Sequence, residues 1–185
     1  GHQAIIAAAR KAVGPQGTVV FHSFDPPPLS VLKPAIPFHR LTAIDNRISL
    51  LGSYGVDEVN VLTPTQLLLE MSPESFVLDL VEQHQPDVIV EGENFRFGQG
   101  RAGTIETLES LGELHGFKVI RVAQVERTLN DCSLVHVSSS TVRWLLSNGR
   151  VEDAATLLGR SYAISGTVVK GDQRGRAIGF PTANM

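Results

Sequence analysis

The sequence has a single cysteine, Cys132, and almost no excess of charge of either sign. One cysteine cannot form an intrachain disulfide or a cysteine-based zinc site, which favours a protein of the reducing cytoplasm. The net charge of −3 over 185 residues provides no basic surface for nucleic acid, so any phosphate ligand must be bound by a local site. No apolar run approaches the ~20 residues that cross a bilayer. We therefore expect a cytoplasmic protein without a nucleic-acid or membrane partner, of unknown oligomeric state.

The first 158 residues alternate between strand-like and helix-like segments. Apolar residues at helical spacing, bounded by Ser, Thr, Pro and Gly, predict helices over 2–13, 42–55, 104–115, 138–149 and 151–158, and another that begins at Ser72-Pro73. Short β-branched runs predict strands over 18–21, 58–62, 87–90 and 118–122. This order predicts an α/β fold, with a mostly parallel, Rossmann-like sheet covered by helices on both faces.

Three further segments have distinctive local signals. Thr42 and Asp45 stand at the spacing of a capping box and predict a capped helix start. The run Phe24-Asp25-Pro26-Pro27-Pro28 predicts a loop, because proline disrupts helices. From Tyr162 onward, the sequence is rich in strand-forming residues and in residues typical of tight turns, which predicts the start of an all-β unit.

The helix predicted after Val137 is led by Ser138, Ser139 and Ser140, with Arg143 one turn further on. Serines cap the exposed N–H groups of a helix start, and those N–H groups attract anions. The arginine adds a fork of donors that suits phosphate. On residue types alone, a capped helix with a solvated arginine is the more common explanation of the pattern.

A glycine-rich segment, 91–103, follows the third predicted strand. Its four glycines permit positive φ angles and a close approach of the backbone to a ligand. Asn94 can hydrogen-bond a ligand, whereas Phe95 and Phe97 fit either stacking on a ligand or packing in the core.

With these motifs in this order, the sequence resembles the bacterial bifunctional riboflavin kinase/FMN adenylyltransferases (FAD synthetases). Gly1-His2 resembles the end of the family's His-x-Gly-His motif, and residues 24–28 resemble Phe-Asp-Pro-His-Pro with Pro27 in place of histidine. Residues 92–98 resemble the family's Gly-x-Asn/Asp-Phe-x-Phe-Gly loop. Residues 138–143 resemble Ser-Ser-Thr-x-Ile-Arg, and residues 179–184 carry Pro-Thr-Ala-Asn.

The resemblance implies transfer of an adenylyl group from ATP to FMN, giving FAD and pyrophosphate, and phosphorylation of riboflavin by a separate β unit. His2 and Arg143 would be catalytic. The ATP phosphates would be bound by Gly1, His2, Ser138, Ser139, Ser140 and Arg143. The flavin would be bound by Phe24, Asp25, Asn94, Phe95 and Phe97. Thr182 and Asn184 would contact the kinase nucleotide. Mg²⁺ would arrive with ATP, held mainly by phosphates and water, with no protein metal cluster.

The sequence departs from the family pattern at both ends. The family's first strand is absent before Gly1, and the kinase barrel is cut after its start. We therefore expect a fragment: an adenylyltransferase domain over 1–158 without its first strand, then the beginning of a riboflavin kinase domain over 159–185. This fragment would be inactive by itself. Two alternatives remain open, another adenylyltransferase of the same superfamily and a non-catalytic nucleotide- or flavin-binding module.

Overall fold

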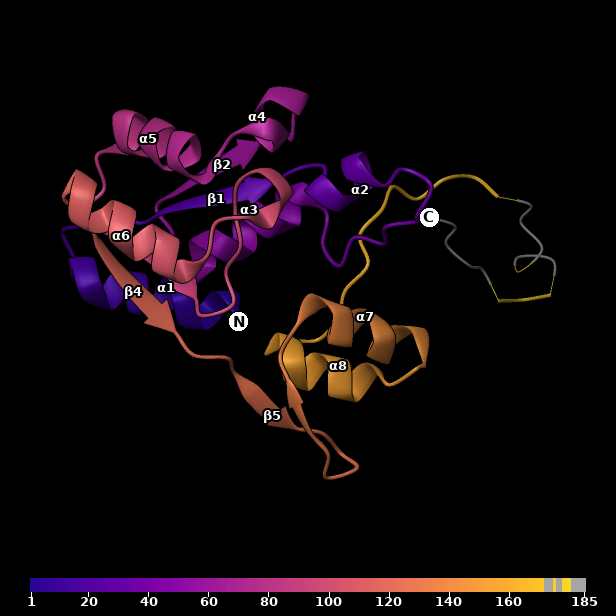
Figure 1. Ribbon diagram of the computed structural model, residues 1–185. Coiled ribbons are helices and arrows are strands. Elements are labelled where there is room, and N and C mark those ends of the chain that lie inside the picture. The colour runs from indigo at the N-terminus through magenta and orange to yellow at the C-terminus, as the bar shows by residue number, and fades with distance from the viewer. Residues whose placement is uncertain (172–174, 176–177, 181–185) are drawn as a thin grey trace.

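Four strands form two separate parallel pairs in the computed structural model, which describes residues 1–171, 175 and 178–180 (Figure 1). Strand β1 (Val20–Phe24) pairs with β2 (Glu58–Leu62), and β3 (Val88–Gly92) pairs with β4 (Lys118–Val122). The register places Val20 opposite Glu58 and Val88 opposite Lys118. The predicted α/β class is therefore confirmed, although β1 and β3 begin and end slightly later in the chain than expected.

The helices pack on these strands through two apolar layers. Helix α1 (His2–Val13) contacts β3 and β4, and its Ile6 is buried with Val19, Leu51 and Val56 beside α3 (Ile44–Ser53). A second layer lies between α5 (Pro73–His84), α6 (Ile105–His115) and the β3–β4 pair. Its buried members are Val77, Phe97, Ile105, Leu108, Leu111 and Phe117. Burial of these side chains drives the packing, since each contributes roughly 1.5–3 kcal/mol.

Most helix boundaries follow from their capping residues. The Ser72 hydroxyl accepts from the Ser75 N–H at 3.1 Å, and Thr104 forms a reciprocal capping box with Thr107. The capping box predicted at Thr42 and Asp45 is wrong. Helix α3 begins at Ile44 with Ala43 as its N-cap and no side-chain cap. The Thr42 hydroxyl instead accepts a hydrogen bond from Arg160 at 3.2 Å, so a tertiary contact replaces the local one.

Several short elements were not predicted. Pro28 was expected in a loop, but it begins α2 (Pro28–Leu32), where proline is tolerated because the first N–H of a helix needs no partner. The others are α4 (Gln66–Glu70), the 3₁₀ turn η1 (Gln99–Arg101) and the antiparallel hairpin of β5 (Glu126–Thr128) and β6 (Leu134–His136).

The hairpin leads into α7 (Ser139–Ser147) and α8 (Val151–Leu158), which pack against each other (Figure 1). Their buried side chains are Leu129, Val142, Leu145, Ala154 and Leu157. The carboxylate of Asp153, 4% exposed, accepts from the Asn130 N–H at 2.8 Å and pairs with Arg150 at 2.7 Å. This buried ion pair fixes the hairpin turn on α8.

The predicted start of a β-barrel after Tyr162 is not confirmed. Residues 161–168 form neither helix nor strand, and Ile164 and Val168 are exposed. An isolated strand is not stable without neighbours to pair with. Thr182 and Asn184 lie outside the described residues. Across the described ranges, no helix has the length and apolarity needed to cross a membrane.

Candidate functional site

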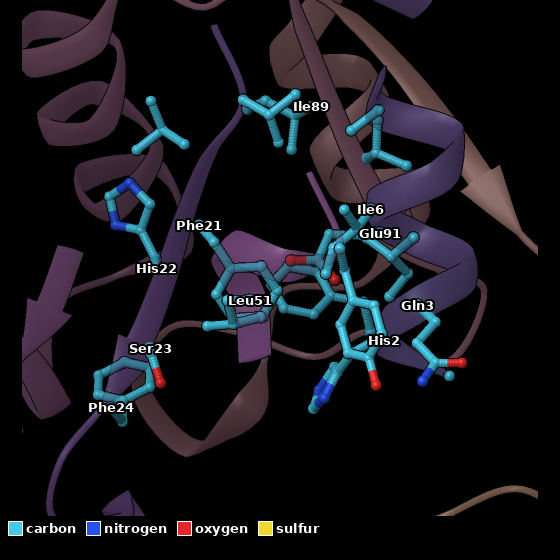
Figure 2. A pocket seen from close by; sticks show the side chains of 18 of the residues that line it. His2, Gln3, Ile6, Phe21, His22, Ser23, Phe24, Leu51, Ile89 and Glu91 are labelled. Atoms are coloured by element: carbon cyan, nitrogen blue, oxygen red, sulfur yellow. The ribbon is translucent and has the colours of Figure 1, made fainter. Parts of the chain in front are cut away.

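A cavity of about 1960 Å³ lies between the two strand pairs. Residues 20–24 of β1 and 88–91 of β3 line it, and no hydrogen bonds pair these two strands. Figure 2 shows side chains of this pocket, with His2 and Gln3 from α1, Phe21 and Phe24 from β1, and Glu91 from β3. The cavity is therefore bordered by the facing edges of two strands that belong to different sheets.

The first residues of α1 and α7 meet at this cavity. A methyl group placed on Gly1 would lie 3.9 Å from the carbonyl oxygen of Val137, immediately before the start of α7. The Ser138 hydroxyl accepts from the Thr141 N–H at 3.0 Å. The N–H groups of Ser139 and Ser140 have no acceptor within the described part of the chain. Two helix N-termini side by side provide free N–H donors and two positive dipole ends, which favour an anion.

His2 is accessible to solvent through the cavity, and its ring makes an edge contact with Phe21 at 5.7 Å between centroids. Burial among the cavity walls lowers the pKa of His2, and the guanidinium of Arg47 lowers it further. The lowered pKa favours the neutral imidazole, which has one ring N–H available to donate.

Arg143 enters the cavity from α7. Its guanidinium carbon lies 4.4 Å from the centre of the Phe38 ring, and its Nε donates to the carbonyl of His39 at 2.7 Å. Burial lowers the pKa of Arg143, but arginine stays charged at neutral pH. The two terminal nitrogens have no acceptor among the described residues, so they are available for phosphate oxygens.

The flavin-side residues predicted from the sequence divide into two groups. Phe24 and Phe95 line the cavity. Phe97 does not; it is 6% exposed, stacks on Phe95 at 5.3 Å and belongs to the core. Asn94 is exposed in the turn after β3, and Asp25 pairs with Arg40 at 3.1 Å; neither lines the cavity.

On the phosphate side, Gly1, His2, Ser138, Ser139 and Arg143 line the cavity, whereas Ser140 is exposed outside it. The structure therefore brings together seven of the predicted residues within the described chain. They are Gly1, His2, Phe24, Phe95, Ser138, Ser139 and Arg143.

Sequence reasoning missed several charged residues of the cavity. Arg47 falls between Ile44 and Leu51 on the apolar stripe of α3, and a charged residue on such a stripe was the available signal. Glu91 interrupts the apolar run of β3 in the same way. Burial raises the pKa of Glu91 to about 7.

Comparisons with known proteins agree with this architecture. The sequence model of the FAD synthetase family matches residues 1–139, and that of the riboflavin kinase family matches residues 158–185. Bifunctional riboflavin kinase/FMN adenylyltransferases of Buchnera aphidicola subsp. Schizaphis graminum and of Escherichia coli K12 are each 32% identical over the whole chain. The chain spans 59% and 58% of their respective lengths.

A solved structure is also similar. The crystal structure of a protein described as a macrolide-efflux protein from Streptococcus pneumoniae superposes with a TM-score of 0.83 at 28% identity. The match covers 99% of this chain and 58% of that one. Since the FAD synthetase model matches 139 of the 185 residues, the chain belongs to the FAD synthetase family.

Proposed function

We propose that this chain forms the adenylyltransferase site of a protein that joins FMN to ATP, giving FAD and pyrophosphate. The observation that carries the proposal is the meeting of the α1 and α7 N-termini in one cavity, with His2 and Arg143 at its wall. The cavity also has aromatic side chains, Phe24 and Phe95, that suit a flavin ring.

In this reaction a phosphate oxygen of FMN attacks the α-phosphorus of ATP, and the bond from that phosphorus to the β-phosphate oxygen breaks. Such transfers depend mainly on positioning and on stabilisation of spread negative charge. The ring N–H of His2 would donate to an oxygen at the reacting phosphorus. Arg143 and the N–H group of Ser139 would hold the departing pyrophosphate.

Mg²⁺ would be bound with the nucleotide. Within the described residues, no group of three or more His, Cys, Asp or Glu side chains is placed to hold a metal ion. Mg²⁺ commonly keeps several waters and relies on substrate phosphates, so the hydroxyl- and amide-rich phosphate side of this cavity fits an ion that arrives with ATP. When bound, the ion would offset charge on the phosphates.

The domain that carries this site would be a Rossmann-like unit over 1–158, completed by one further strand between β1 and β3. Both strands present an edge to the cavity that has no hydrogen-bonded neighbour among the residues that the structure describes. A parallel strand there would fill the part of the cavity between these edges and give one continuous sheet. The ligand site would then be the remaining part of the cavity, at the switch point beside the α1 and α7 N-termini. Such a strand would come from chain upstream of Gly1.

Residues 159–185 would begin a riboflavin kinase domain, with Thr182 and Asn184 at its nucleotide site. The match of the riboflavin kinase family to residues 158–185 supports this boundary. Riboflavin would then be the substrate that this second domain converts to FMN. A cytoplasmic location is consistent with a single free cysteine, Cys132.

A non-catalytic nucleotide- or flavin-binding role is the second candidate. Pro27 lines the cavity at the position where the resemblance expects a histidine, so one imidazole is missing there. The adenylyltransferase proposal therefore requires that His2 and Arg143 suffice for the chemistry.

The test is Arg143→Ala in the full-length protein. Loss of a charge-assisted contact to the transition state costs about 3–4 kcal/mol, so FAD formation should fall about 100- to 1000-fold. Phosphorylation of riboflavin should stay within twofold, and Arg143→Lys should recover part of the loss, because a point charge does not replace a bidentate fork. Equal loss of both activities in separate assays would contradict the assignment of Arg143 to the adenylyl site.

A further inference from the structure

Arg47, on α3, is a half-buried arginine that lines the same cavity. Its NH1 donates to the hydroxyl of Ser23 at 2.9 Å and to the carbonyl of Phe24 at 3.0 Å. These two bonds use both hydrogens of NH1 and hold the end of β1 against α3. NH2 and Nε, with three more N–H donors, have no acceptor among the described residues.

The charge of Arg47 has no counterion in the described part of the chain. The arginines that form ion pairs there are Arg10, Arg40, Arg121 and Arg150. A half-buried cation without a carboxylate is costly, and such groups are usually paired. An anion that enters the cavity would supply the missing partner.

The position of Arg47 indicates where in the cavity this anion would lie. Arg47 bonds to Ser23, two residues along β1 from Phe21, whose ring contacts the His2 imidazole at 5.7 Å between centroids. The carbonyl that Arg47 holds belongs to Phe24, whose side chain lines the cavity. Arg47 is therefore close to the point where the His2 end of α1 and the flavin side of the cavity come together.

We infer that Arg47 binds a phosphate oxygen beside His2, as a second cationic side chain that acts from α3 while Arg143 acts from α7. The inference rests on the proposed adenylyl transfer and adds a substrate-binding residue to it. The phosphate belongs either to ATP or to FMN, because both phosphates meet at His2 in that reaction. NH1 anchors the loop after β1, and NH2 with Nε bind the anion.

A purely structural role would need only the two bonds of NH1. A glutamine amide also has two N–H donors, so Arg47→Gln could keep those bonds without the charge. Ser23→Ala removes one anchoring bond and leaves the charge. Lys11→Gln, on the exposed last turn of α1, removes one positive charge away from the site and serves as the matched control.

The experiment measures inhibition of FAD formation by inorganic pyrophosphate and the KM values for ATP and FMN in the full-length protein. If Arg47 binds a phosphate of ATP, we expect Arg47→Gln to weaken inhibition by pyrophosphate at least tenfold. If it binds the phosphate of FMN, we expect the KM for FMN to rise at least tenfold. Ser23→Ala and Lys11→Gln should stay within threefold of the wild type. Arg47→Lys, which keeps the charge, should lie between the wild type and Arg47→Gln.

Two results would overturn the inference while the proposed function stands. One is a wild type that forms FAD and an Arg47→Gln variant whose pyrophosphate inhibition and KM values are unchanged. The other is a Ser23→Ala variant as defective as Arg47→Gln, or an Arg47→Lys variant no better than it, since anchoring would then account for the effect. A wild type that neither forms FAD nor responds to pyrophosphate would overturn the proposed function and the inference together.

Discussion

Replacement of Glu91 by glutamine should stabilise the protein at alkaline pH and much less at acid pH. Glu91, on β3, lines the cavity (Figure 2), and burial raises the pKa of its carboxyl from 4.5 to about 7. Between these two pH values the folded protein holds a proton that the unfolded chain has released. The free energy of unfolding therefore falls as the pH rises through this window.

The size of the effect follows from the shift. A pKa shift of this size lowers the free energy of unfolding by about 3 kcal/mol once Glu91 is ionised in both the folded and the unfolded state, because each pKa unit is worth 1.36 kcal/mol. Glutamine has nearly the same shape and no charge, so Glu91→Gln removes this penalty. We expect a gain of about 2–3 kcal/mol at pH 8 and at most about 1 kcal/mol at pH 5.

The assay is thermal unfolding of the wild type and the variant at pH 5, 6, 7 and 8. A gain of 2–3 kcal/mol corresponds to roughly 4–12 °C in Tm for a domain of this size. Glu82→Gln, on the exposed face of α5, is the matched control and should change Tm little at any pH. A gain for Glu91→Gln that is equal at pH 5 and pH 8, or a loss at pH 8, would refute the reasoning.

Two other stability predictions follow from buried polar contacts. Arg10 donates to the carbonyls of Gly14, Gly17 and Gly55, so Arg10→Met should destabilise the protein by about 2–4 kcal/mol, measured by thermal unfolding. The control Lys11→Met should cost less than about 0.5 kcal/mol. Asp153→Ala should cost about 2–4 kcal/mol, because it leaves the Asn130 N–H without an acceptor and Arg150 without its buried partner; a Tm within 2 °C of the wild type would contradict this.

Three of the predicted helices have starts that depend on neighbouring residues. Ser72, Thr104 and Ser138 cap helices by local hydrogen bonds to N–H groups three residues further on, so the relevant partners are visible in the sequence. Thr42 has the same residue type but bonds to Arg160, 118 residues away. No local pattern could reveal that partner. The same reason explains why the β5–β6 hairpin was missed, since both strands are largely exposed and the buried Leu129 between them packs beside α7 and α8.

The candidate site likewise contains residues that the sequence could predict and residues that only the tertiary structure reveals. Gly1, His2 and the serines before α7 stand at helix starts, where anion-binding N–H groups are expected from the sequence alone. Phe95 and Phe97 are equivalent in sequence, and only the tertiary structure shows that Phe95 lines the cavity while Phe97 is buried in the core. Arg47 could be noticed as a charge on an apolar helix face, but its contact with β1, whose Phe21 contacts His2, depends on how α3 packs against that strand.

The most direct measurement of the central claim follows the phosphorus atoms of ATP. The full-length protein is incubated with FMN, Mg²⁺ and ATP labelled at either the α- or the γ-phosphate, and the products are separated. Adenylyl transfer predicts that the α-label appears in FAD and the γ-label in pyrophosphate. Binding of both substrates without transfer of the α-label would contradict the account. So would parallel incubations in which nicotinate mononucleotide or phosphopantetheine accepts that label and FMN does not.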